Sequence, residues 1–89
     1  MTLPQRGLYH MMTPIDKRRC EAISDFLRLL QRRLAIPSQG AMARELGMTE
    51  GTYKMRLRDP RRMTLTELWS VERVARRVGL TLPEVRTYV

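Results

Sequence analysis

The segment 38–57, SQGAMARELGMTEGTYKMRL, constrains the fold more than any other part of the chain. Ser38 and Thr49 are of the residue types that cap the first turn of a helix. Gly47 stands where a chain leaving one helix needs positive φ, which glycine adopts without steric cost. Ala43, four residues earlier, is small enough for a second helix to cross there. The segment therefore predicts two short helices joined by a tight turn at Gly47.

Helix start and stop signals continue on both sides of this segment. Thr13 followed by Pro14 begins a long helix whose apolar residues recur at helical spacing up to Leu34. Thr64 and Glu67 form a capping box, so another helix begins there. We expect the buried stripe of that helix to consist of Leu65, Leu68, Val71, Val74, Ala75 and Val78. Helices are therefore predicted at 14–34, 39–46, 50–58 and 65–78, with a short last helix from 81 onward.

The chain is predicted to be all-α, because no strand pattern competes with these helices outside the N-terminal arm. At 89 residues it is long enough for one domain. We expect four or five helices, the first of them long, to form a single domain over 14–89. Pro4, Gly7 and Pro14 interrupt any regular pattern before it, so an irregular arm is predicted over 1–13.

Positive charge dominates the composition, with a net charge of +8 and 15 Arg against 2 Lys. Such a balance favours nucleic acid as partner, and an anionic membrane surface less strongly. Arg suits contact with phosphate or guanine, but a GC-rich genome also raises Arg usage, so both explanations for the excess stay open. On the first helix we expect a merely solvated face at Lys17, Arg18, Arg28, Arg32 and Arg33.

Several classes of protein are not supported by the residues present. Cys20 and His10 are the single cysteine and histidine, so neither an internal disulfide nor an ordinary zinc site is expected. No Ser-His-Asp set, glycine-rich phosphate loop or carboxylate pair indicates an enzyme or a cofactor. No apolar run approaches the roughly 18 residues of a membrane span, and no signal-peptide core is present. We therefore expect a cytoplasmic protein with no membrane association.

Residues 38–80 resemble the lambda-repressor/Cro-like (XRE) family of helix-turn-helix DNA-binding proteins. That family carries S/T-Q-x-x-L-A-x-x-L-G-h-S/T, where h is apolar, then a recognition helix, a loop with proline, and a helix ending in h-A-x-x-L-G. The match places the helix-turn-helix core at 38–58. The residues that carry it are Ser38, Gln39, Met42, Ala43, Leu46, Gly47, Met48, Thr49, Thr52, Tyr53, Leu57, Pro60, Thr64, Leu65, Leu68, Val74, Ala75, Val78, Gly79 and Leu80.

The resemblance implies that helix 50–58 enters the major groove of double-stranded DNA. Tyr53 and Leu57, four apart, should face the core, which turns the remaining positions outward. Candidate base contacts are Glu50, Gly51, Lys54, Met55 and Arg58. Candidate phosphate contacts are Gln39, Arg44, Thr49, Thr52, Arg56, Arg61 and Arg62.

Two glycines depart from the family pattern. Gly40 stands in the first turn of helix 39–46, where a larger residue is usual. Gly51 stands in the recognition helix, at a cost of about 1 kcal/mol relative to Ala. Either the backbone approaches DNA closely at Gly51, or this position reads no base.

The sequence thus predicts a transcriptional regulator of the repressor type, resembling phage or mobile-element repressors, that binds a palindromic operator as a homodimer. Trp69 suits either the core or a dimer contact. The main alternative is an antitoxin or adaptor that binds another protein, such as a toxin. RNA binding is less favoured because the pattern buries several aromatic residues. Candidates for the dimer interface are Trp69, Leu82, Val85, Tyr88 and Val89.

Overall fold

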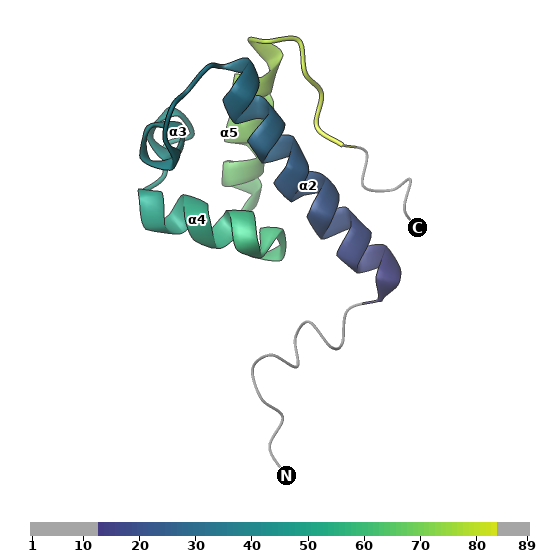
Figure 1. Cartoon of the computed structure of the whole chain (residues 1–89). Coiled ribbons are helices and arrows are strands. Elements are labelled where there is room, and N and C mark those ends of the chain that lie inside the picture. The colour runs from purple at the N-terminus through teal and green to yellow at the C-terminus, as the bar shows by residue number, and fades with distance from the viewer. Residues whose placement is uncertain (1–12, 84–89) are drawn as a thin grey trace.

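The computed structural model describes residues 13–83 of the chain (Figure 1). No strand occurs among these residues, which confirms an all-α fold for this part of the chain. The expected arm before residue 13 and the expected last helix after residue 83 lie outside the described residues. The elements are α2 (Pro14–Arg33), α3 (Gln39–Glu45), α4 (Glu50–Arg58), the 3₁₀ turn η1 (Pro60–Arg62) and α5 (Leu65–Arg76).

Each α-helix begins directly after the residue that was predicted to cap it. The hydroxyl oxygens of Thr13, Ser38, Thr49 and Thr64 each accept a hydrogen bond from the backbone N–H three residues later, at 3.0 to 3.1 Å. At α5 the Glu67 side chain also accepts from the backbone N–H of Thr64, which completes the predicted capping box. These bonds satisfy N–H groups that a helix leaves unpaired at its start.

The connection between α3 and α4 has the turn that its glycine predicted. Gly47 has φ +76°, in the region that glycine adopts most readily. The backbone N–H of Met48 donates to the carbonyl oxygen of Ala43 at 2.8 Å, which closes the turn. Ala43 is fully buried, and α3 packs against α4 (Figure 1).

Side chains from all four α-helices meet in one hydrophobic core. Burying one such side chain contributes about 1.5–3 kcal/mol relative to leaving it exposed. The core fixes the inner faces of α3 and α4 and leaves their outer faces to solvent. Its members are Phe26, Leu27, Leu30, Met42, Ala43, Leu46, Tyr53, Leu57, Val71, Val74 and Ala75.

The expectation that Leu65 is buried is wrong, because its side chain is 65% exposed. Residues advance by about 100° each around a helix. Leu65 therefore lies about 120° and 180° around the helix from Val71 and Val74, which face the core, and about 80° from Ala75. Sequence spacing suggested one continuous stripe, but only Val71, Val74 and Ala75 are fully buried, while Leu68 and Val78 are half-buried.

Candidate nucleic-acid interface

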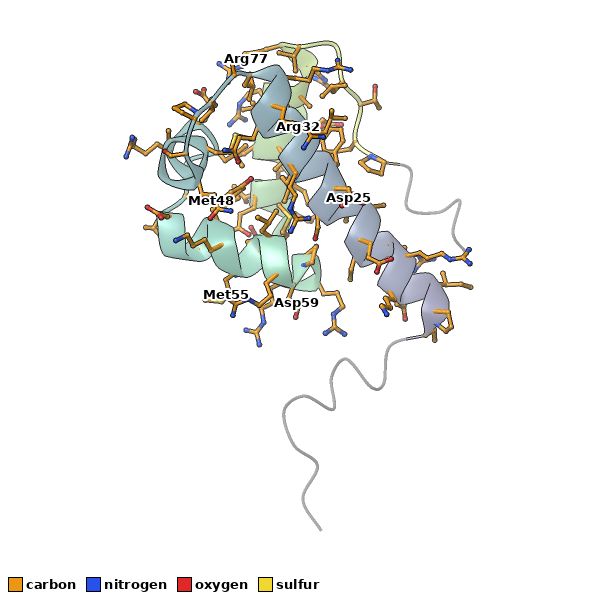
Figure 2. All side chains as sticks on the ribbon, viewed as in Figure 1. Asp25, Arg32, Met48, Met55, Asp59 and Arg77 are labelled. Carbon is orange, nitrogen blue, oxygen red and sulfur yellow. The ribbon has the colours of Figure 1, made fainter. Side chains whose placement is uncertain are left out.

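The outer face of α4 is a row of exposed side chains held in place by two buried ones. Tyr53 and Leu57 are 0% and 8% exposed, as their spacing predicted. Met55 lies on the opposite side of the helix, away from the body of the protein (Figure 2). All the predicted base-contact residues are exposed: Glu50, Gly51, Lys54, Met55 and Arg58.

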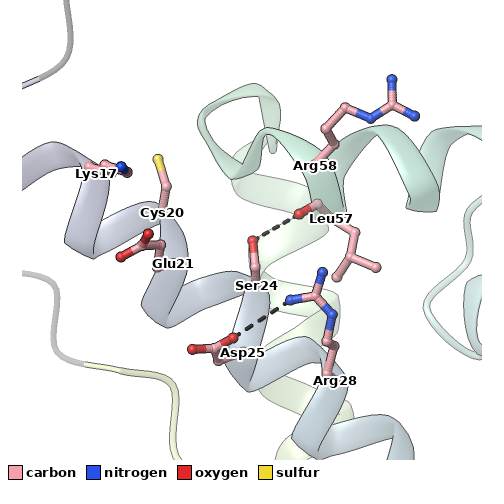
Figure 3. A pocket seen from close by; sticks show the side chains of 8 residues that line it. All are labelled: Lys17, Cys20, Glu21, Ser24, Asp25, Arg28, Leu57 and Arg58. Atoms are coloured by element: carbon pink, nitrogen blue, oxygen red, sulfur yellow. Dashed lines mark hydrogen bonds and ion pairs between the residues drawn. The ribbon is translucent and has the colours of Figure 1, made fainter. Parts of the chain in front are cut away.

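Two polar contacts fix α4 against its neighbours. The Ser24 hydroxyl of α2 donates a hydrogen bond of 2.8 Å to the carbonyl oxygen of Leu57 (Figure 3). Arg56 Nε donates to Glu67 Oε1 of α5 at 2.7 Å, and Arg56 Nη2 donates to Oε2 at 3.3 Å. The orientation of α4 is therefore set from both sides without using its outer face.

The Arg56–Glu67 ion pair is shielded from solvent, with each side chain 18% exposed. The hydrogen bond from Arg56 is the largest cause of a lowered pKa at Glu67, and the same bond raises the pKa of Arg56. Arg56 was predicted to contact phosphate. That contact stays a prediction, and it would require the guanidinium to leave its partner within the protein.

The two arginines that follow α4 share one carboxylate. Arg61 Nε donates to Asp59 Oδ1 at 3.0 Å, and Arg62 Nε lies 3.7 Å from Asp59 Oδ2. The hydrogen bond from Arg61 is the largest cause of the lowered pKa of Asp59. Both arginines are exposed, and in the chain they precede Met63 and Thr64, the cap of α5. They are therefore placed where a polyanion can reach them.

Glu50 reaches the first turn of α3, where its carboxylate lies over Gly40. A Cβ atom at Gly40 would lie 2.8 Å from Glu50 Oε1, so a larger residue would displace this carboxylate. The other oxygen, Oε2, lies 2.9 Å from Lys54 Nζ. A Cβ atom at Gly51 would meet nothing within 4 Å. Packing therefore does not require Gly51, and both explanations for it stay open.

A cleft of about 310 Å³ lies among α2, α3 and α4. It brings together three predicted contact residues, Gln39, Lys54 and Arg58, and its apolar wall is Leu57. Its remaining residue, Arg28, belongs to the face of α2 that we expected to be only solvated. The place of Arg28 at this cleft was not predicted, because helical spacing assigns a residue to a face but not to the neighbouring helix which that face meets.

The other predicted phosphate contacts do not line this cleft. Arg44 is exposed on α3. Thr49 and Thr52 hydrogen-bond to each other through their hydroxyls at 3.0 Å, so both side chains already have a partner. The positive charge is therefore distributed over several places around α4.

The predicted dimer-interface residues lie in different environments. Trp69 is 58% exposed and does not belong to the core. Leu65, one turn earlier on α5, is exposed as well. Leu82 is half-buried and packs against the core. The other candidates, Val85, Tyr88 and Val89, lie outside the described residues.

Residues 13–83 contain no group of three or more His, Cys, Asp or Glu side chains placed to hold a metal ion. Cys20 is buried, and burial raises the pKa of its thiol, which makes it a poor nucleophile at neutral pH. None of the helices in this range combines the length and the apolar character needed to cross a lipid bilayer.

Comparisons of this chain with protein-family models, with curated proteins and with solved structures found no match.

Proposed function

We propose that this chain is a sequence-specific DNA-binding transcriptional regulator of the lambda-repressor/Cro-like helix-turn-helix type, with α4 as its recognition helix. The observation that carries the proposal is the outer face of α4, where Lys54 and Arg58 stand exposed while the inner face is buried. The major groove of B-DNA, about 12 Å wide, admits one α-helix. Arg58 or Lys54 donates to a guanine edge there, and Met55 touches a thymine methyl.

Phosphate contacts on either side of α4 hold it in the groove. Gln39 at the start of α3 and Arg44 further along it contact one part of the DNA backbone. Arg61 and Arg62 on η1 contact another part. Contacts of this kind supply affinity and register without reading sequence.

The protein acts in this proposal as a homodimer on a palindromic operator. Two copies of α4 then read half-sites about one helical turn, or 34 Å, apart. The exposed side chains of Leu65 and Trp69 on α5 support a seam between copies, because large apolar side chains left in water favour association. Binding over a promoter would block polymerase, as a phage or mobile-element repressor does.

Selection of duplexes from a random DNA library at physiological salt, followed by sequencing, tests the proposal. We expect an enriched palindrome with half-sites about one turn apart. The double variant Lys54→Ala, Arg58→Ala should enrich nothing, whereas Arg32→Ala, Arg33→Ala at the end of α2 should select the same palindrome. Weak binding that salt abolishes, with no enriched sequence, would mean charge attraction alone and would refute the regulator.

A second candidate function is an antitoxin or adaptor whose main partner is another protein. The exposed Trp69 favours it, because tryptophan is enriched among residues that dominate protein interfaces. Co-purification with a single protein at high salt, lost in Trp69→Ala but kept in the Lys54→Ala, Arg58→Ala variant, would support this function over operator binding.

A further inference from the structure

The charged side chains that line the cleft among α2, α3 and α4 are all positive. Arg28, Lys54 and Arg58 line it, together with the Gln39 amide and the apolar Leu57. Within the described residues, no carboxylate contributes to the lining. Lys54 Nζ is already paired with Glu50 Oε2 at 2.9 Å, so the guanidinium groups and the Gln39 amide are the donors that suit an oxyanion here.

The backbone of Arg28 is held firmly relative to α4. Leu27 and its neighbour Phe26 are buried in the core, and Ser24, one turn before Arg28, donates to the carbonyl oxygen of Leu57. In Figure 3 Arg28 rises from α2 beside Leu57, while Arg58 leaves α4 in the direction away from α2. Both residues line the cleft, but it is the Arg28 guanidinium that lies beside Leu57, between two helices whose relative position is fixed.

The only carboxylate paired with Arg28 in the described residues holds it weakly. Asp25 Oδ1 lies 3.6 Å from Arg28 Nη1, and the side chains are 79% and 54% exposed. An exposed pair of this kind contributes less than about 1 kcal/mol. Arg28 can therefore exchange this partner for a more highly charged one at little cost.

The adjoining space on the other side of Arg28 is less suitable for an anion. A larger cleft of about 500 Å³ shares Arg28, Leu57 and Arg58 with the first one and adds Lys17, but Glu21 and Asp25 also line it (Figure 3). These carboxylates repel an oxyanion. The position most favourable for an anion is therefore the cleft lined by Gln39 and Lys54.

The geometry points to Arg28 as a further phosphate-binding residue, which seats one phosphodiester of the DNA backbone in this cleft together with Gln39. The inference rests on the proposed function and adds α2 to the DNA-contacting elements. Arg presents two parallel N–H donors to a phosphate, and the Gln39 amide adds a donor from α3. A phosphate held between α2 and α3 fixes the angle at which α4 enters the groove, so Arg28 positions the protein and reads no base.

The test compares Arg28→Gln with Arg32→Gln, a matched change one turn further along α2 at a residue that does not line the cleft. The dissociation constant is measured over a range of salt concentrations, on the selected operator and on an unrelated duplex. Arg28→Gln should weaken binding to both duplexes about tenfold, the effect of losing one charged hydrogen-bonded contact. It should also reduce the slope of log K against log salt by about 0.9, the value for one phosphate. Arg32→Gln should change neither quantity, and Arg28→Lys should keep the salt slope.

Titration of the protein with inorganic phosphate gives a readout that does not need DNA. Nitrogen-15 NMR should show a saturable shift of the Arg28 Nε–H signal that is absent at Arg32. Equal salt slopes for wild type and Arg28→Gln, with operator binding intact, would overturn the role of Arg28 and leave the regulator standing. A wild-type protein that binds no duplex would overturn both, and a phosphate shift in that case would assign the cleft to a free phosphate group.

Discussion

Glu50 places a negative charge on the face of α4 that we propose to meet DNA. Its carboxylate pairs with Lys54 at 2.9 Å and reaches over Gly40. In the free protein it therefore neutralises one of the cations available to a phosphate. In a complex the same oxygens can accept a hydrogen bond from a cytosine amino group. In the proposed complex, Glu50 therefore weakens binding to any duplex and strengthens binding where its carboxylate meets cytosine.

Glu50→Gln separates these two effects. Removing the charge should tighten binding to an unrelated duplex up to about fivefold, because an exposed ion pair with Lys54 is worth at most about 1 kcal/mol. Discrimination at one base pair should fall by about 1–3 kcal/mol, because the acceptor for cytosine is weakened. Binding to the operator and to single-base variants of it is measured by titration. Weaker binding to the unrelated duplex would contradict this account of Glu50.

Ala35 has a backbone conformation that suits glycine. It follows α2 with φ 56°, while its N–H donates to Arg32 and the N–H of Ile36 donates to Gln31. These bonds close the end of α2 in the manner usually built with glycine. Alanine pays about 1–2 kcal/mol for left-handed φ.

Ala35→Gly should therefore raise the free energy of unfolding by about 0.5–1 kcal/mol, the strain removed less the extra freedom of glycine in the unfolded chain. Ala22→Gly in the middle of α2 is the control and should lower the same free energy by about 1 kcal/mol. Urea denaturation followed by circular dichroism measures both. If both variants lose stability equally, the strain assigned to Ala35 is absent.

At the scale of elements, the helix starts could be predicted because each depends on a hydrogen bond between residues only three apart in the sequence. The hydroxyl of Thr13 or Ser38 accepts a hydrogen bond from the backbone N–H three residues later, and this bond does not depend on how the rest of the chain packs. The burial of Leu65 was predicted wrongly and the place of Arg28 at the cleft was not predicted, because both depend on how helices cross, which the spacing within one helix does not contain. The outward face of α4 could be predicted from two buried positions, but the neighbours that share its cleft could not.

The Arg56–Glu67 pair shows how α4 is oriented against α5. It joins the last part of one helix to the capping box of the next. Both side chains are mostly shielded, so the pair contributes more than an exposed one. The pKa of Glu67 is lower in the folded protein than in the unfolded chain. The contribution is therefore complete above the glutamate pKa of the unfolded chain, about 4.3, and disappears as pH falls through the folded value.

Arg56→Met should lower the free energy of unfolding by about 1–2 kcal/mol at pH 7, since it removes two charge-assisted hydrogen bonds and keeps the apolar stem of the side chain. The difference from wild type should shrink as pH falls below about 4, when Glu67 becomes protonated. Arg76→Met is the matched control, because its pair with Glu72 is long, at 3.7 Å, and exposed. Thermal or urea denaturation from pH 7 to pH 3 measures the effect. A difference that does not change with pH would show that Arg56 acts through packing and not through its charge.

At the scale of the whole molecule, the described residues expose two kinds of side chain that suit different partners. The exposed cations of α4 and η1 suit a polyanion, consistent with a net charge of +8. The apolar side chains of Leu65 and Trp69 on α5 do not line the cleft and suit a protein surface. In the proposed complex, a second copy of the chain bound at α5 uses none of the residues that we propose to contact DNA.

In a two-fold dimer the same patch serves both copies, so one substitution removes two contacts. Trp69→Gln should therefore weaken dimerisation about 30-fold or more, the effect of losing a central tryptophan from an interface. The monomer should stay folded, because Trp69 is exposed and contributes nothing to the core.

Sedimentation velocity over a range of concentrations measures the dimer. The matched control is Met55→Gln, which changes an exposed apolar residue of α4. On DNA the Trp69→Gln protein should bind a full palindrome no more tightly than an isolated half-site. If the variant instead remains dimeric, the seam lies elsewhere and Trp69 is available to a different protein partner.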